Sequence, residues 1–269
     1  YDNSNIIQKL FMRKNVNLLK EDNNFIGYIW FEKQNKYHSC INSMNVIEEG
    51  NLICFYKNLI GSVVNNSLIT YECEDNKVNI DILSELGFNR AKGFRELEKQ
   101  CFEYSNTFVP SGITFSIVKT NKDEKLRCFL QNEIFENDDR IPINIEDIYY
   151  DQVQEYYFDK GAIFINFNNE PIGYGQIIIE DKSAIIVNFG IIEKYRNVGY
   201  GKVLLRYLLN IATNNNFSKV SLRVDSDNIV AYNLYSSLGF KIIKEFYTWQ
   251  KLKTKDEKLK TKDEKVDRR

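Results

Sequence analysis

The sequence contains a single histidine, and this shortage excludes several kinds of active site. His38 is the only histidine among 269 residues, so a zinc site that needs several histidines is excluded. A Ser-His-Asp or Cys-His nucleophile system would have to use this one side chain. Because His38 lies between two strand-like runs, we expect it at the surface or in a turn. We therefore expect neither a zinc hydrolase nor a triad hydrolase, and no bound metal.

Cysteine pairs, long apolar runs and an excess of one charge are also missing. The five cysteines are odd in number and include no CxxC pair, which is typical of small buried residues in a reducing compartment. No apolar run approaches the roughly 20 residues of a membrane span, and the N-terminus has no signal-peptide pattern. The formal net charge of −1 favours neither nucleic acid nor an anionic membrane as a partner. We therefore expect a cytoplasmic protein whose partners are small or neutral.

What the sequence does contain is a glycine-bearing loop between an apolar strand and a helix. The strand predicted over residues 183–192 leads into Arg196-Asn197-Val198-Gly199-Tyr200-Gly201-Lys202, and a helix is predicted over 202–213. Glycine allows positive φ and close backbone approach, and the unpaired amides of a helix's first turn attract an anion. The loop therefore predicts a binding site for a pyrophosphate.

A second group of residues follows this loop along the chain. Asn228, Ala231, Leu234 and Tyr235 precede Leu238-Gly239-Phe240. Together with the R-x-x-G-x-G pattern of the loop, this group resembles the GNAT superfamily of acyl-CoA-dependent N-acyltransferases. The resemblance implies a mixed α/β (α+β) fold with a mixed sheet, in which two central strands separate at one end and hold the pantetheine arm of the acyl donor.

The resemblance also implies acetyl-CoA as the acyl-donor substrate and assigns roles to individual residues. The expected cofactor-binding residues are Phe189, Gly190, Ile191, Arg196, Asn197, Val198, Gly199, Tyr200, Gly201, Lys202 and Asn228. Asn228 has a second expected role as a helix N-cap, and the two roles are compatible. Tyr235 is the expected catalytic residue, because a phenol with a pKa of about 10 would protonate the leaving thiolate. The alternative for Tyr235 is a core aromatic.

No general base stands out in the sequence. Glu180, Glu193 and Asp225 lie near the appropriate strand ends, but each is also typical of a solvated turn, and we choose none of them. In GNAT enzymes that acetylate ribosomal-protein N-termini, a glutamate sits five residues before the asparagine. This chain has Arg223 at that position, which argues against such a peptide specialist.

The sequence also contains an internal repeat. Four segments recur in the same order at a spacing of 145 to 152 residues. They are Phe25-Ile26-Gly27-Tyr28 with Pro171-Ile172-Gly173-Tyr174, residues 42–48 with 187–193, Asp75-Asn76 with Asp227-Asn228, and Leu86-Gly87-Phe88 with Leu238-Gly239-Phe240. The recurrence predicts a tandem GNAT-like protein; chance matches in a chain rich in Ile, Asn and aromatic residues are the alternative.

The first copy is damaged where the second carries its motif. It is seven residues shorter there and has Glu49-Gly50-Asn51, with one glycine, an adjacent carboxylate and no Arg or Lys; a carboxylate repels a pyrophosphate. Leu83 takes the place of Tyr235. We therefore expect a degenerate N-terminal domain over 1–105, a catalytic domain over 106–250 and a charged low-complexity tail over 251–269.

Hydrophobic periodicity and turn residues predict the remaining elements. Helices are predicted over 6–19, 52–60, 79–86, 125–135, 145–158 and 228–238, with Asn144 and Asp147 as an imperfect capping box. Further strands are predicted over 25–31, 39–47, 67–72, 113–118, 162–167, 172–180, 219–224 and 241–249. Residues 95–108 show no clear pattern.

These features predict an N-acetyltransferase that transfers an acetyl group from acetyl-CoA to a primary amine of a small molecule or peptide by direct attack in a ternary complex. An alternative from another class is a non-catalytic acyl-CoA-binding sensor or scaffold, and the lack of an obvious base motivates it. A third is a structural or partner-binding protein without affinity for CoA. The amine, the acyl-chain preference and the oligomeric state stay open.

Overall fold

The computed structural model describes residues 15–47, 50–63, 67–101, 108–137 and 140–252, and the chain divides into two compact units. Unit 1 comprises Tyr1–Phe94 and Lys244–Arg269, and unit 2 comprises Arg95–Ile243. Two strands, β5 (Asn89–Gln100) and β11 (Lys241–Leu252), each contribute residues to both units. The units therefore follow contacts in space, whereas the repeat boundaries at 105 and 250 follow the sequence and stay a prediction.

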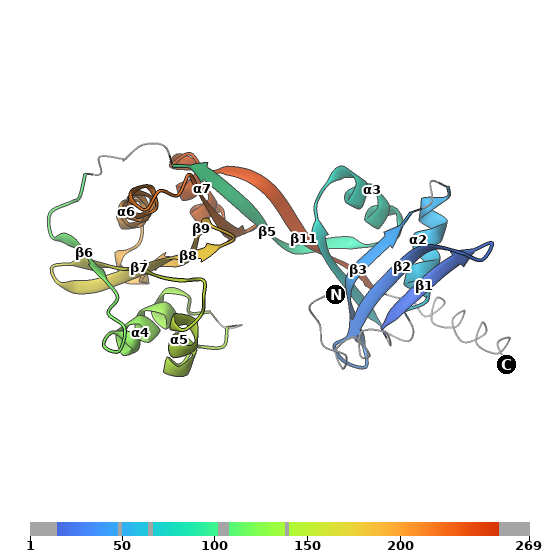
Figure 1. The fold of residues 1–269 in the computed structure, drawn as a ribbon, viewed down its shortest axis with the longest axis horizontal. Helices are drawn as coiled ribbons and strands as arrows, with labels where there is room; N and C mark the ends of the chain where they lie inside the picture. The colour runs from blue at the N-terminus through green and yellow to red at the C-terminus, as the bar shows by residue number, and fades with distance from the viewer. Residues whose placement is uncertain (1–14, 48–49, 64–66, 102–107, 138–139, 253–269) are drawn as a thin grey trace. The chain divides into compact units, whose positions relative to one another are not determined.

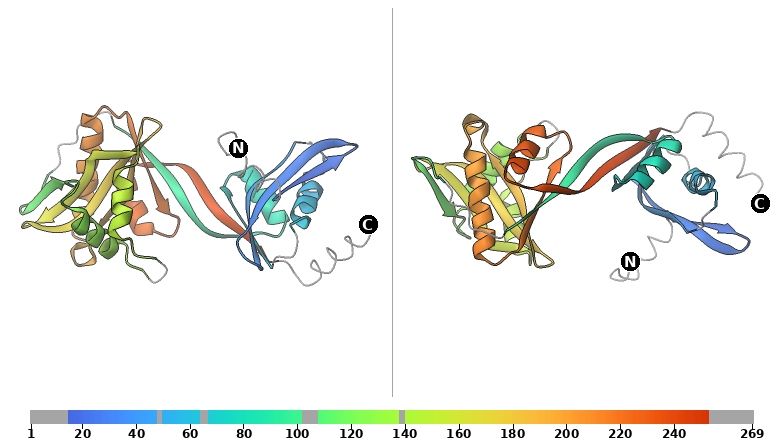
Figure 2. Two further views of the ribbon diagram at one scale, coloured as in Figure 1. Left: turned by 60° about the horizontal axis from the view of Figure 1, so that its bottom comes forward. Right: turned by 90° about the horizontal axis from the view of Figure 1, so that it is seen from above.

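Unit 2 is a mixed α/β layer structure. Its strands lie in the order β5-β10-β9-β8-β7-β6, antiparallel from β6 to β9 and parallel between β9 and β10. The strands are β6 (Ile113–Ile117), β7 (Tyr157–Phe167), β8 (Glu170–Glu180), β9 (Ser183–Ile191) and β10 (Lys219–Asp225). The helices are α4 (Glu124–Ile134), α5 (Ile145–Gln152), α6 (Tyr200–Asn214) and α7 (Ile229–Ser237), with a 3-10 turn η1 (Glu193–Tyr195). Helices α4 and α5 cover one face of this sheet, and α6 and α7 cover the other (Figures 1 and 2).

Both faces of the sheet in unit 2 are buried along β7 and β8, and this explains the apolar sequences of these two strands. Helix α6 places Leu204, Leu205 and Leu208, all without exposed surface, on the core that β7 to β10 complete. Full burial of one such side chain contributes about 1.5–3 kcal/mol. On the opposite face, Leu130 and Ile134 of α4 pack in a second cluster of buried residues. Strands buried on both faces read as continuous apolar runs, as β7 and β8 do.

Unit 1 is a smaller version of the same arrangement. Its strands lie in the order β1-β2-β3-β4-β11-β5, and α2 packs on the first three of them. They are β1 (Val16–Glu21), β2 (Asn24–Lys33), β3 (His38–Val46) and β4 (Leu68–Glu74), with helices α2 (Leu52–Gly61) and α3 (Lys77–Glu85). The core is formed by buried aliphatic residues together with Phe31, Phe88, Cys73 and, from β11, Trp249.

The four repeated segments occupy the same places in the two units. Gly27 pairs with Val46 in unit 1, as Gly173 pairs with Ile191 in unit 2. At both glycines, an added Cβ would lie within 3.0 Å of a carbonyl oxygen of the neighbouring strand. Asn76 and Asn228 both cap a helix, and Gly87 and Gly239 both follow one with φ of 80° and 87°. The chain therefore has the duplicated, mixed α/β fold expected from its sequence.

Most predicted elements are confirmed, and two helices are not. Val16–Glu21 is strand β1, because it pairs with β2 from Val16↔Trp30 onward, so the helix over 6–19 is wrong there; residues 1–14 lie outside the described part of the chain. The helix over 145–158 ends at Gln152, because Tyr157 already pairs with Ile178 as part of β7. The capping box of Asn144 and Asp147 is confirmed on both of its hydrogen bonds.

Residues 95–100 form the second half of β5, a strand that the sequence pattern did not reveal. In this half only Leu97 is fully buried, while Glu96 and Glu98 on the other face pair with Arg223 and Lys219. A strand with one buried apolar side chain gives little alternation to read. Residues 102–107 and 253–269, most of the predicted tail, lie outside the described residues, while Lys251 and Leu252 end β11.

The positions of the histidine and the cysteines in the fold differ in part from those expected from the sequence. His38 begins β3 and shares a hydrogen bond of 2.8 Å with Thr70, so the expected turn position is wrong. All five cysteines are free, but only Cys73 is buried, so the expectation of burial fails for the other four. Burial raises the pKa of the Cys73 thiol to about 12. Among the described helices, none is long and apolar enough to cross a membrane.

Candidate active site

Strands β9 and β10 separate at the end that leads to the predicted loop. Their paired residues run from Val220↔Ala184 to Leu222↔Ile186 and then stop. In the described strands, residues 187–191 have no partner on the β10 side. At this point β9 carries a bulge, since Asn188 has φ of 50° and the register with β8 shifts between Tyr174 and Gln176. The separation expected between the two strands is thus present.

The loop that follows β9 leaves a row of backbone amides unpaired. Asn197 has φ of 64°, and Gly199 has φ of 94° as the N-cap of α6. Gly199 has no side chain that could cap the helix. Among the described residues, no hydrogen-bond acceptor is found for the amides of residues 197–201. Together with the positive end of the α6 dipole, these amides form a site suited to an anion.

The Arg196 side chain holds the backbone beside this loop. Its Nε donates to the Ile191 carbonyl at 2.8 Å, and its Nη2 donates to the Ile134 carbonyl at 2.7 Å. It thereby ties the end of β9 to the end of α4. Gly190 is in close contact with the same helix, because a Cβ there would lie 2.2 Å from Ile134. The Arg196 guanidinium is therefore engaged with protein carbonyls, and a contact of this residue with the acyl donor stays a prediction.

The remaining loop residues differ in what their side chains touch. Val198 is 65% exposed. The Tyr200 ring packs on Phe167, with ring centroids 5.8 Å apart. A Cβ added to Gly201 would lie 3.4 Å from Leu234 of α7, an ordinary contact. Gly201 thus faces the neighbouring helix. The backbone N–H of Lys202 donates a hydrogen bond to the Gly199 carbonyl within the first turn of α6.

Helix α7 contributes the two other expected residues. The Asn228 side chain caps α7 by accepting from the Ala231 amide at 3.0 Å. The Tyr235 ring is 7% exposed and lies between the rings of Phe189 and Phe240, with centroids 6.0 Å from each. Burial raises the pKa of the Tyr235 phenol to about 12. The structure thus brings Tyr235 against β9 in the segment that no longer pairs with β10, which links the two predicted groups of residues.

Known proteins share both this domain and this fold. Residues 129–240 match the model of the acetyltransferase (GNAT) family. Unit 2 contains a GNAT-family domain. The structure resembles a GCN5-related N-acetyltransferase from Sphaerobacter thermophilus, with a TM-score of 0.68 and 13% identity over 86% of this chain and 78% of that one.

Two further solved structures extend the GNAT likeness across both units. A tandem GNAT protein from the clavulanic acid biosynthesis pathway has a TM-score of 0.60 and 10% identity, covering 88% of this chain and 83% of that one. A GNAT acetyltransferase from Colwellia psychrerythraea has a TM-score of 0.60 and 13% identity, covering 90% of this chain and 87% of that one. At these identities the likeness concerns the fold alone.

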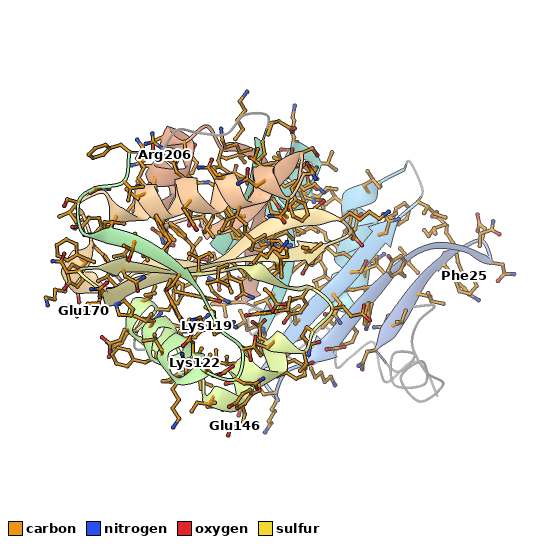
Figure 3. All side chains as sticks on the ribbon, turned by 60° about the vertical axis from the view of Figure 1, so that its left-hand side comes forward. Phe25, Lys119, Lys122, Glu146, Glu170 and Arg206 are labelled. Atoms are coloured by element: carbon orange, nitrogen blue, oxygen red, sulfur yellow. The ribbon has the colours of Figure 1, made fainter. Side chains whose placement is uncertain are left out.

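A cavity of about 540 Å³ opens beside the separated strands of the GNAT domain. Its lining includes Val187 and Asn188 of β9, Arg223 of β10, and Glu96 and Glu98 of β5. Figure 3 shows the sheet that carries these strands between α5, with Glu146, and α6, with Arg206. The cavity lies on the sheet face opposite the α6 core, because the alternate β10 residues 220, 222 and 224 are buried in that core.

Charged side chains of both signs line this cavity. Glu96 accepts from Arg223 at 2.8 Å, and Glu98 accepts from Lys219 at 2.7 Å. Glu180 also lines it and makes no ion pair with any described residue. Of the other carboxylates considered as bases, Glu193 lies in η1 and Asp225 ends β10. Sequence reasoning missed Glu96 and Glu98, since no pattern placed their strand beside β10.

The same cavity contains no recognisable metal site. Across the residues that the structure describes, no group of three or more His, Cys, Asp or Glu side chains is arranged to hold a metal ion.

Proposed function

We propose that this protein is an N-acetyltransferase that moves an acetyl group from acetyl-CoA to a primary amine of a small molecule or peptide. The observation that carries the proposal is the row of unpaired amides at residues 197–201, placed next to the separated strands and to Tyr235. A pyrophosphate and a thioester are the two parts of acetyl-CoA that such a combination suits.

The donor would lie along three successive features of unit 2. The pyrophosphate binds the loop amides, with Lys202 adding positive charge nearby. The pantetheine arm follows Phe189, Gly190 and Ile191, whose outer edge has no β10 partner. Asn228 uses its carbonyl oxygen for the helix cap, which leaves its NH₂ group to donate to the arm.

The acceptor amine would reach the thioester from the cavity. It must attack as a neutral amine, held about 3–3.5 Å from the thioester carbon. A C–N bond forms, the C–S bond breaks, the nitrogen loses one proton to solvent or a base, and the thiolate gains one. Backbone N–H groups of β9 beside the thioester would stabilise the oxyanion of the tetrahedral intermediate.

Tyr235 would act on the leaving group. Because its pKa is about 12, it stays protonated at neutral pH and donates a hydrogen bond to the thiolate as charge develops on sulfur. Its hydroxyl makes no hydrogen bond to the described residues that would compete with this role.

We further propose that unit 1 does not catalyse. Its corresponding helix, α2, is capped by the Asn51 side chain, which accepts from the Cys54 amide at 3.3 Å. Leu83, 1% exposed in the core of unit 1, replaces the phenol.

The test is a turnover assay with the full chain, acetyl-CoA and three primary-amine probes: spermidine, glucosamine and a lysine-containing peptide. The expected result is a mass increase of one acetyl group on at least one amine that depends on both protein and acetyl-CoA. Saturable acetyl-CoA binding by calorimetry with no acetylated amine would instead support the sensor, and no binding at all would contradict both.

A further inference from the structure

The bulge in β9 is attached to a network of buried polar side chains. Gln176, without exposed surface, lies in β8 next to the bulge. Its Oε1 accepts from Arg127 Nη2 at 3.0 Å, from the Tyr174 hydroxyl at 3.1 Å and from Asn188 Nδ2 at 3.2 Å. Its Nε2 donates to Asp151 Oδ2 at 3.1 Å, and Asp151 is ion-paired with Arg127.

The two charged members of this network determine which of the other side-chain groups donates and which accepts each hydrogen bond. An arginine side chain can only donate and an ionised carboxylate can only accept, so Arg127 and Asp151 fix which end of the Gln176 amide faces each of them. The oxygen of Gln176 must then face Asn188, and Asn188 must present its NH₂ group to it. The carbonyl oxygen of the Asn188 side chain is consequently turned away from the network.

That oxygen belongs to a residue that lines the cavity. Asn188 is part of the cavity wall beside the separated strands, and its Oδ1 makes no hydrogen bond to any residue that the structure describes. It lies in the strand segment along which the proposed acyl donor would run. A hydrogen-bond acceptor of fixed orientation is therefore available where the acceptor amine would meet the thioester.

We propose that Asn188 binds the acceptor amine, with its Oδ1 accepting a hydrogen bond from the amine N–H and thereby aiming the nitrogen lone pair at the thioester carbon. Gln176 and Arg127 are positioning residues that act through Asn188. This inference rests on the proposed acetyltransferase function and adds to it a substrate-contacting residue and the reason for its orientation.

Two substitutions at position 188 separate the side chain from the backbone. Asn188 has φ of 50°, which glycine adopts without strain and alanine does not. Asn188→Gly keeps the bulge and removes the amide, so we expect kcat/KM for the amine to fall about tenfold, the effect of one lost hydrogen bond. The acetyl-CoA dissociation constant from calorimetry should stay within about twofold. Asn188→Ala should show the same loss together with a lower melting temperature.

Tyr174→Phe is the matched control within the network. It removes one donor to the same Gln176 oxygen, while Arg127 still fixes the amide, so kcat/KM for the amine should stay within about twofold of the wild type. The assay uses whichever of spermidine, glucosamine and the lysine peptide the wild type acetylates.

The outcomes are distinct. An Asn188→Gly variant that is as active as the wild type overturns the inference and leaves the acetyltransferase function standing, and equal losses in Asn188→Gly and Tyr174→Phe do the same. A wild-type protein that does not bind acetyl-CoA, or binds it and acetylates none of the amines, overturns both.

Discussion

The two units begin their corresponding helices in opposite ways. In unit 1, Asn51 caps α2 with its own side chain. In unit 2, α6 begins at Gly199, which offers no cap, and the preceding amides also lack partners among the described residues. A side-chain cap is worth about 1 kcal/mol to a helix. Unit 2 thus forgoes a stabilising contact at the place where a ligand would supply it, while unit 1 satisfies the same groups internally.

The next pair of corresponding helices, α3 and α7, also combines a feature common to both units with one that differs between them. Asn76 and Asn228 cap α3 and α7 identically, so this feature serves the fold in both units. One helical turn before the closing glycine of each unit, Leu83 completes a core in unit 1, whereas Tyr235 brings a phenol to the separated strands in unit 2. Positions shared by both units thus have at least a structural role, and the positions that differ are where unit 2 gains groups suited to chemistry.

The largest expected effect comes from removing β5 from the GNAT domain. Leu97 of β5 belongs to the core of unit 2, and β5 lies between β10 and β11. A fragment of residues 106–269 should therefore give no folded circular-dichroism spectrum and no acetyl-CoA binding, because it lacks the strand beside β10 and the core side chain of Leu97. A fragment of residues 89–269 retains β5 and should keep both properties. Equal behaviour of the two fragments would contradict the structural role of β5.

A charge in the predicted pyrophosphate loop should have the next largest effect. Val198→Glu adds a carboxylate at a 65% exposed position, so it should weaken acetyl-CoA binding at least tenfold by repulsion without changing the melting temperature. Val198→Gln has the same size without the charge and should bind almost as the wild type does. If the two variants bind alike in a calorimetric titration, the loop does not hold the pyrophosphate.

Tyr235→Phe should lower kcat about 10- to 100-fold and leave the acetyl-CoA dissociation constant unchanged. Because the pKa of Tyr235 is about 12, the wild-type rate should rise with pH up to about 10 as the amine loses its proton, without a fall from phenol ionisation. A loss of acetyl-CoA affinity in the variant would assign the phenol to binding instead.

The same raised pKa predicts a pH dependence of stability. The unfolded phenol releases its proton near pH 10, whereas the folded one holds it to about 12. The contribution of the protonated Tyr235 phenol to the free energy of unfolding is therefore fully present below pH 10 and is lost as the pH rises toward 12. Urea unfolding of the wild type and of Tyr235→Phe between pH 9 and 11 should show a steeper decline for the wild type; parallel curves would contradict the burial of the hydroxyl.

The smallest expected difference is between two equivalent caps. Asn76→Ala and Asn228→Ala should each lower the free energy of unfolding by about 1 kcal/mol through loss of the cap. Only Asn228→Ala should also weaken acetyl-CoA binding, because only this residue lies beside the proposed donor site. Should both variants bind acetyl-CoA like the wild type, Asn228 serves the helix alone.

The loop and the two helices of the site were predictable because local chemistry determines them. Positive φ at Gly199, the cap at Asn228 and the stop at Gly239 each follow from residue type at one position. The hydrogen-bond partners of the Arg196 side chain were not predictable, since one of the two is the carbonyl of Ile134, 62 residues away in α4.

Other features depended on which strands become neighbours. Gln176 and Asn188 are single polar residues in apolar strands and give no spacing signal, yet the sheet places them together with Arg127 and Asp151. Strand β5 was unreadable because its charged face lines a cavity.

The central claim is that unit 2 alone binds the acyl donor, and the stoichiometry of acetyl-CoA binding tests it most directly. A calorimetric titration of the full chain should give one site per chain, lost in Val198→Glu and retained in Val198→Gln. Two sites per chain, or one site that survives Val198→Glu, would contradict the account, because acetyl-CoA would then bind away from the open start of α6.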